Sequence, residues 1–181
     1  ALRWAGHGLN LNSSGSGARA YDGLIRNCYR GCTSCQGSAM PLRAIAYVSQ
    51  ALPDLSADRL QALVDDAARF NKLAGVTGVL LHDGGRFLQY IEGPPDGIDS
   101  VYERILQAGS HVDIVELARS RLGQRQFPYW AMRVLQVEAS MLHGLTVGDW
   151  AGFSRALQGD RAAPTAVDLL ADIVQPALHA G

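Results

Sequence analysis

The stretch GVTGVLLHDGGRFLQYIEG, residues 75–93, decides the fold. Two apolar runs, Val76–Leu81 and Arg86–Ile91, flank Asp83-Gly84-Gly85. Asp-Gly and Gly-Gly supply the positive φ angles that tight hairpin turns require, so the runs predict two antiparallel strands. Both faces of the second strand are largely apolar, which is typical of a central strand covered on both sides. Gln89 lies in this strand, and a buried amide is costly unless it is hydrogen-bonded.

A strand and a helix are predicted before the hairpin. Leu42–Ser49 is a short apolar run that ends before a proline-containing loop, and it places Tyr47 on one face of a strand. The helix that follows has Ser56 as its N-cap and Gly75 just beyond its end. Its apolar stripe, continued at 3–4 spacing, reaches Asn71. A second uncharged amide is therefore expected on a row that faces the core.

The segments after the hairpin complete an α+β fold. Asp96–Ala108 predicts a helix capped by Asp96, and Val112–Leu122 and Trp130–Val137 predict two more strands. The resulting βαββαββ order is the ferredoxin-like, split βαβ arrangement with one extra edge strand. We expect the first and third strands to be parallel neighbours at the centre of the sheet. Two helices would then cover the face that carries Tyr47.

We divide the chain into three parts. Residues 1–39 are rich in Gly, Ser, Asn and Arg, and we expect them to be disordered or to be a tag or read-through extension. Residues 40–137 form the sheet domain. Residues 138–181 form a C-terminal helical extension that packs on the other face of the sheet, with amphipathic helices over about Thr146–Leu157 and Thr165–Leu178.

The composition excludes several classes of function. The net charge is −1, with no basic face, which argues against nucleic acid as a partner. No apolar run approaches the ~18 residues of a membrane span, and no secretory signal is recognisable, so we expect the cytoplasm. Cys28, Cys32 and Cys35 have the spacing of a radical SAM iron–sulfur motif. Because the barrel that such a motif needs is absent from the predicted fold, a chance match is the preferred interpretation.

Three polar side chains are expected to converge on the face that the first two helices cover. Tyr47 and Gln89 would be neighbours in the sheet, and Asn71 would lie above them. A flat ring rich in heteroatoms, held between helices that present Leu63 and Ile105, would satisfy all three polar groups. The alternative is that Tyr47 and Gln89 bond each other and Asn71 caps the end of its helix.

Four motifs carry a resemblance to a known family. They are Tyr-x-Ser at residues 47–49, Asn71 before Gly-Val-Thr-Gly, Arg-Phe-Leu-Gln at residues 86–89 continuing to Glu92-Gly93, and Trp-x-Met at residues 130–132. Together they resemble the BLUF domain, the sensor of blue light using flavin. The resemblance implies a short single-domain photoreceptor that holds FAD, or alternatively FMN, non-covalently between two helices.

The resemblance also implies roles for single residues. Gln89 matches the glutamine at the flavin N5 and O4 edge, and Tyr47 matches the tyrosine that bonds this glutamine and gives an electron to the excited flavin. Asn71 matches the asparagine at the C4-carbonyl and N3 edge. Leu63 and Ile105 match the aliphatic residues that sandwich the ring.

Five further residues are assigned by the same comparison. Trp130 and Met132 match a pair that can exchange places near the glutamine, and Ser49 completes the Tyr-x-Ser motif as a cofactor-binding residue. Arg104 and His111 are expected to contact the phosphate or ribityl chain. Phe70 departs from the polar residue usual before the asparagine, so one hydrogen bond to the ring edge is expected to be absent or made by water.

A sensor of this length would pass its signal to an unknown downstream protein or act through a homodimer. The alternatives are a small flavin-dependent or acylphosphatase-like enzyme on the same fold, and a light-inert binding module. His82, Asp83 and His111 lack metal-ligand spacing, so no metal is predicted. The basic run of Arg119, Arg121 and Arg125 is either a solvated edge or a phosphate or partner patch.

Overall fold

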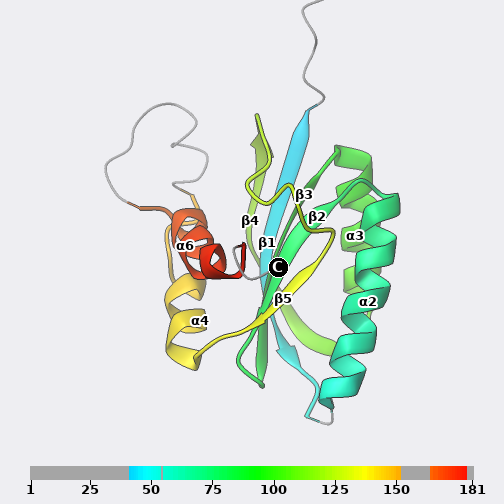
Figure 1. Cartoon of the computed structure of the whole chain (residues 1–181), viewed down its shortest axis with the longest axis vertical. Coiled ribbons are helices and arrows are strands. Elements are labelled where there is room, and N and C mark those ends of the chain that lie inside the picture. The colour runs from blue at the N-terminus through cyan, green and yellow to red at the C-terminus, as the bar shows by residue number, and fades with distance from the viewer. Residues whose placement is uncertain (1–40, 54, 152–163, 179–181) are drawn as a thin grey trace, which may run out of the picture. The chain divides into compact units, whose positions relative to one another are not determined.

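The computed structural model describes residues 41–53, 55–151 and 164–178 (Figure 1). The predicted extension at residues 1–39 and its three cysteines lie outside this range. No helix in the described ranges is both long enough and apolar enough to cross a membrane.

The described chain contains the predicted βαββαββ order. The strands are β1 (Leu42–Ala51), β2 (Thr77–His82), β3 (Arg86–Gly93), β4 (His111–Leu122) and β5 (Arg133–Gln136). The helices are α2 (Ala57–Leu73), α3 (Pro95–Leu106), α4 (Ala139–Thr146) and α6 (Ala166–Leu178). The fold class is confirmed as α+β and ferredoxin-like.

The five strands form one sheet in the order β4-β1-β3-β2-β5. β1 and β3 are central neighbours, as predicted, and Tyr47 lies opposite Gln89. The prediction that they run parallel is wrong, because their pairing is antiparallel. The α2 crossover leaves β1 and β2 pointing the same way, and the hairpin then reverses β3. β5 is the extra edge strand and pairs parallel with β2.

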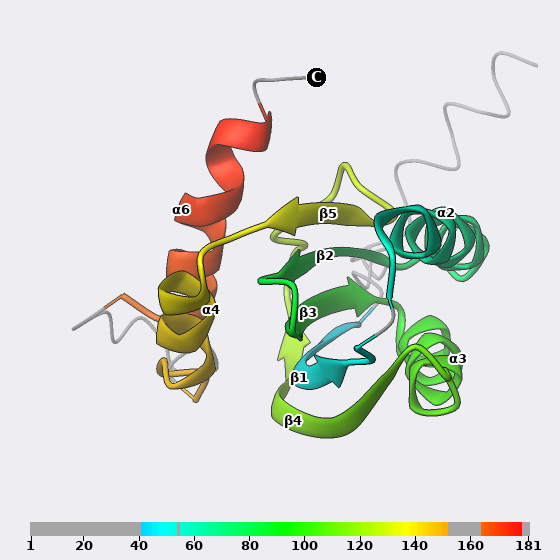
Figure 2. The same ribbon diagram turned by 90° about the horizontal axis from the view of Figure 1, so that it is seen from below.

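Helices cover both faces of the sheet (Figure 2). α2 and α3 lie on one face, and α4 and α6 lie on the other. Ile45 and Ile91 of the sheet pack with Ile98 and Val101 of α3. The larger cluster on the opposite face joins the sheet to α4 and α6, with Tyr90 fully enclosed in it. This two-sided burial confirms the expectation drawn from the apolar faces of the hairpin.

Local capping chemistry sets the helix starts. Ser56 accepts a hydrogen bond from the Arg59 amide, as an N-cap serine does, which confirms the predicted start of α2. The predicted Asp96 cap is wrong, since α3 begins at Pro95 and has no side-chain cap. Proline suits the first helical position because its fixed φ is already helical, and Asp96 lies in the first turn, where a negative charge is favourable.

The C-terminal region differs from the prediction in one helix. The helix expected over Thr146–Leu157 is instead α4, which ends at Thr146, and residues 152–157 lie outside the described ranges. Leu142 and Leu145 form the buried stripe of α4, three residues apart. The Trp150 indole donates to the Leu145 carbonyl at 2.8 Å and closes the end of this helix. The helix expected over Thr165–Leu178 is confirmed as α6.

Candidate functional site

A cavity of about 730 Å³ lies between α2 and α3 over the sheet. Its volume is in the range of small-molecule and cofactor sites, and its lining combines apolar side chains with a few polar groups. Eight of the ten predicted site residues line it: Tyr47, Leu63, Asn71, Gln89, Arg104, Ile105, His111 and Met132. Ser49 and Trp130 are not among the lining residues.

Tyr47 and Gln89 form the floor of this cavity. Their side chains are 2% and 5% exposed, and the Tyr47 hydroxyl donates a hydrogen bond to Gln89 Oε1. Gln89 Nε2 donates to the Met132 sulfur at 3.5 Å. Burial raises the pKa of the Tyr47 phenol far above its usual range, and the neighbouring Tyr102 adds to this. Tyr47 therefore stays protonated and acts as a hydrogen-bond donor to the glutamine.

Asn71 reaches the cavity from the last turn of α2. Its side chain is buried, and Nδ2 donates to the Ala131 carbonyl at 2.8 Å. The alternative that this amide caps its own helix is wrong, because the end of α2 is closed by the Ala74 amide, which bonds the Phe70 carbonyl. Asn71 instead connects α2 to the segment that leads into β5.

Met132 and Trp130 lie on opposite sides of the sheet. Met132 lines the cavity beside Gln89, while Trp130 packs against the cluster under α4 and α6. The strand expected over Trp130–Val137 begins only at Arg133, and Ala131 lies in a bend. This bend explains the separation, since residues two apart in a regular strand share one face.

The two helices supply the walls of the cavity. Leu63 of α2 and Ile105 of α3 both line it, and the Leu63 side chain is 40% exposed. Arg104 was expected to contact a phosphate or ribityl chain. Here its guanidinium forms an ion pair with Asp66 and lies 4.8 Å from the centre of the Phe70 ring. Arg104 thus links α3 to α2 across the cavity.

His111 and Ser49 form a buried pair at the far end of the cavity. His111 Nδ1 lies 2.8 Å from Ser49 Oγ, and its ring stacks on Tyr47 with 6.1 Å between centroids. Burial lowers the pKa of the imidazole, opposed by a hydrogen bond with the Ile105 backbone. Ser49 therefore touches the site through His111 and not directly.

Sequence reasoning did not assign several of the lining residues to the site, among them Arg59, Asp66 and Phe87. A signal for each was present in the sequence. Phe87 is two residues before Gln89 and so shares its strand face. Arg59 and Asp66 are four residues before and three residues after Leu63, on the same stripe of α2. The stripe was traced through apolar residues, so Arg59 and Asp66 were left out of it because they are charged.

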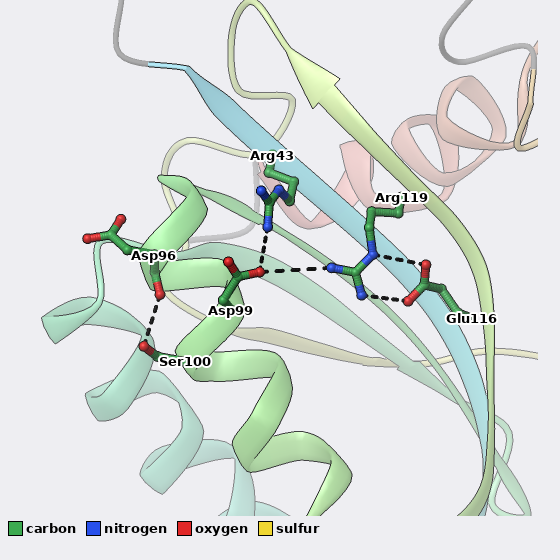
Figure 3. Close-up of polar contacts among 6 residues, drawn as sticks. All are labelled: Arg43, Asp96, Asp99, Ser100, Glu116 and Arg119. Atoms are coloured by element: carbon green, nitrogen blue, oxygen red, sulfur yellow. Dashed lines mark hydrogen bonds and ion pairs between the residues drawn. The ribbon is translucent and has the colours of Figure 1, made fainter.

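Ion pairs join α3 to β1 and β4, because Asp99 of α3 pairs with Arg43 and Arg119 (Figure 3). The side chains drawn are Arg43, Asp96, Asp99, Ser100, Glu116 and Arg119. Arg119 donates to Glu116 at 2.8 Å and lies 5.1 Å above the Tyr102 ring. Tyr102 in turn contacts Tyr47 edge to face, with 6.1 Å between centroids. Arg119 is therefore paired with Glu116 and Asp99 and does not form an open anion patch, while its 39% exposed side chain agrees with the interpretation as a solvated edge.

Arg125 also departs from both interpretations of the basic run. It is half-buried and donates to the carbonyls of Gly75 and Glu92 and to the Thr77 hydroxyl. These contacts fix the loop between β4 and β5. Within the described residues, no group of three His, Cys, Asp or Glu side chains could hold a metal ion.

A family model described as "BLUF: Sensors of blue-light using FAD" matches residues 42–133, just over half of the chain. The chain is 37% identical over 87 residues to the photoactivated adenylate cyclase subunit beta of Euglena gracilis, a match that covers 48% of this chain and 10% of that protein. It is 34% identical over 86 residues to the blue light- and temperature-regulated antirepressor BluF of Escherichia coli (strain K12), covering 48% of this chain and 21% of that protein. The match thus spans a tenth to a fifth of these relatives.

Solved structures show the same fold. The dark-state structure of BlrB, a BLUF protein, is 27% identical with a TM-score of 0.56, and the match covers 77% of this chain and 98% of that one. Photo-activated BlsA, at 21% identity and a TM-score of 0.56, supports the fold alone. The family match falls on the segment that builds the cavity, its phenol and its two amides. The chain belongs to the BLUF family, the sensors of blue light using FAD.

Proposed function

We propose that this chain is a blue-light photoreceptor whose flavin, FAD or FMN, is held non-covalently in the cavity between α2 and α3. The single observation that carries the proposal is the buried hydrogen bond from Tyr47 to Gln89 at the floor of that cavity. A phenol bonded to an amide in this position is the donor pair that the family's photochemistry needs. The family also favours a sensor over the alternative of a small enzyme.

The residues present fit a flavin. Leu63 and Ile105 supply apolar walls for a flat ring. Because Asn71 Nδ2 is engaged by the Ala131 carbonyl, Asn71 Oδ1 is the atom that would accept from the ring N–H. Phe70 lines the cavity under Arg104 and offers no hydrogen bond to the ring edge. His111 and Arg59 also line the cavity and are the proposed contacts of the chain that extends from the ring.

The chemistry assigned to the protein is a short proton and electron path. When bound, the flavin supplies absorption of blue light and accepts one electron. Tyr47 is the proposed donor of that electron, and its proton moves to Gln89 Oε1 along the hydrogen bond already present. Gln89 can then rotate or change tautomer, and return of the electron and the proton to Tyr47 would leave a different set of hydrogen bonds around a cofactor in its starting oxidation state.

The proposed output runs through β5. Gln89 contacts Met132 directly, so a change in the amide alters the bend at Ala131 and, beyond it, Trp130 on the opposite face. Networks of this kind have few discrete arrangements, so a local change can shift a whole element. We propose that the signal reaches a partner protein or a second copy in a homodimer. The names of two relatives combine light with an output, an adenylate cyclase in one and an antirepressor in the other. A cytoplasmic location, and the absence of nucleic-acid and membrane partners, remain predictions from composition.

Absorption spectroscopy of the purified full chain tests the proposal. The protein should carry flavin, and brief blue illumination should move its absorption band to longer wavelength, with full recovery in the dark. Gln89→Leu should keep the flavin and lose this shift, because the amide that rearranges is gone.

Gln107→Leu provides a matched control, since Gln107 also lines the cavity but makes no contact with Tyr47. A wild-type protein that takes up no added flavin would contradict the proposal, as would a shift that survives Gln89→Leu. Steady turnover of NADH with bound flavin would favour the enzyme instead.

A further inference from the structure

Glu92 is a fully buried carboxylate that has no contact with the cavity. It follows Gln89 by three residues in β3 and so points to the opposite face of the sheet. Its Oε1 accepts a hydrogen bond from the Phe127 amide at 2.7 Å. Its Oε2 accepts from the Gln126 amide at 2.8 Å and from the Tyr90 hydroxyl at 3.1 Å. One side chain therefore holds two consecutive amides of the loop between β4 and β5.

Arg125 completes this clamp from the same loop. Its Nη1 donates to the Glu92 carbonyl at 2.8 Å and to Thr77 Oγ1 at 2.7 Å, and its Nη2 donates to the Gly75 carbonyl at 2.5 Å. The Thr77 hydroxyl lies 3.4 Å from Glu92 Oε1 and can donate to it. Through Arg125, the loop is thus bonded to Glu92 at the end of β3 and to Gly75 and Thr77, just before and at the start of β2.

The loop that Glu92 and Arg125 hold lies close in sequence to Met132, which contacts Gln89. Four residues lie between Phe127 and Met132, and two of their carbonyls are also held. The Trp130 carbonyl accepts from the Gly78 amide at 3.0 Å, and the Ala131 carbonyl accepts from Asn71. The Phe127 ring packs on Tyr90 with 5.4 Å between centroids. A chain held at this many points has little freedom in where it puts the Met132 sulfur.

We propose that Glu92 is a positioning residue for the light response. By holding Gln126 and Phe127, its carboxylate fixes the loop that brings Met132 beside Gln89 and keeps Trp130 on the opposite face. It acts through the loop and does not touch the cofactor. The inference rests on the proposed photoreceptor function, and its test separates the two.

The Glu92→Gln variant has the shape of the native residue and the wrong hydrogen-bonding groups. Both carboxylate oxygens face backbone N–H donors, so either orientation of the new amide sets its NH₂ against one of them. A buried donor left without an acceptor is costly, and the loop can relieve this by moving away from β3. The expected consequence is a Met132 that no longer holds one position beside Gln89.

The experiment measures dark recovery of the full-length protein after a blue flash, normalised to bound flavin and well below the unfolding temperature. Glu92→Gln should change the recovery rate by about threefold or more, as expected when a modest coupling between two sites is lost. Glu103→Gln, which makes the same change on the exposed face of α3, should recover like the wild type. Arg125→Lys keeps the charge, loses the geometry of the clamp, and should shift recovery in the same direction.

The outcomes separate the possible failures. A lower unfolding temperature with unchanged recovery per bound flavin would show that Glu92 is only structural, and would overturn the inference. If Glu92→Gln binds no flavin, the dark recovery rate of Arg125→Lys becomes the test. A wild-type recovery rate in Arg125→Lys would then overturn the inference. A wild-type protein that shows no light-induced shift would overturn the proposed function instead.

Discussion

The Tyr47 hydroxyl and the Gln89 amide have complementary and fixed roles. Tyr47 is held protonated by burial, so it donates and Oε1 accepts. This leaves Nε2 as a donor whose neighbour, the Met132 sulfur, is only a weak acceptor. The Gln89 amide thus has one strong hydrogen bond, from Tyr47, and one weak hydrogen bond, to Met132. It can exchange the weak bond when a better acceptor forms. The sequence alone identified both residues, because a polar residue in an apolar strand is conspicuous.

His111 should make the stability of the protein depend on pH. Burial lowers its pKa in the folded state, so between that pKa and the ordinary value near ~6.5 the unfolded chain binds the extra proton. Stability from the neutral ring is present above the ordinary pKa and is lost as the pH falls below it. We expect chemical denaturation to show a steeper loss of unfolding free energy between about pH 7 and pH 5.5 in the wild type than in His111→Gln. An equal pH dependence of the unfolding free energy in the two proteins would argue against a neutral buried imidazole at His111.

The helices and strands are where the sequence predicted most and where its errors have clear causes. Hairpin glycines, the Ser56 cap and apolar periodicity were sufficient for the element order. The predicted direction of β1 relative to β3 was a wrong step from that order, because a helical crossover followed by a hairpin already makes β3 antiparallel to β1. The bend at Ala131 and the contacts of Arg125 depend on partners distant in sequence, which local patterns do not reveal.

The close approach of α3 to the end of α2 depends on Gly97. A Cβ at this position would come 2.2 Å from the Ala74 carbonyl oxygen, so the start of α3 would have to move. Since α2 and α3 form the cavity walls, we expect Gly97→Ala to weaken flavin retention and to cost about 1–3 kcal/mol of unfolding free energy. Urea denaturation and the flavin-to-protein absorbance ratio measure both effects.

Gly123→Ala, outside the cavity lining, is the control for this change. No atom lies within 4 Å of the position where its Cβ would be built. A Gly97→Ala protein as stable and as well loaded with flavin as Gly123→Ala would contradict the packing described for the two helices.

At the scale of the whole molecule, the sheet separates the cavity on one face from the hydrophobic cluster that α4 and α6 cover on the other face. The cavity, Tyr47 and Met132 are on the side of α2 and α3, and Trp130 packs toward α4 and α6. The segment that leads into β5 reaches both sides, with Met132 at the cavity and Trp130 at the opposite cluster. The division into residues 40–137 and 138–181 remains a prediction, and a shared core joins α4 and α6 to the sheet.

Removal of residues 1–39 should leave the light response intact, since every group assigned to it lies beyond Met40. The expected result is the same spectral shift and the same recovery rate in the truncated protein. Triple replacement of Cys28, Cys32 and Cys35 by serine in the full chain is the companion measurement. A response lost in either protein would show that the cysteine segment takes part.

The central claim is that Tyr47 is the electron and proton donor to a flavin through Gln89. The most direct test is the light-minus-dark absorption difference of Tyr47→Phe, compared with Tyr102→Phe, which removes the hydroxyl of the adjacent tyrosine. The account predicts that both variants bind flavin, that Tyr102→Phe keeps the reversible red shift and that Tyr47→Phe loses it. A normal red shift in flavin-loaded Tyr47→Phe would contradict the account.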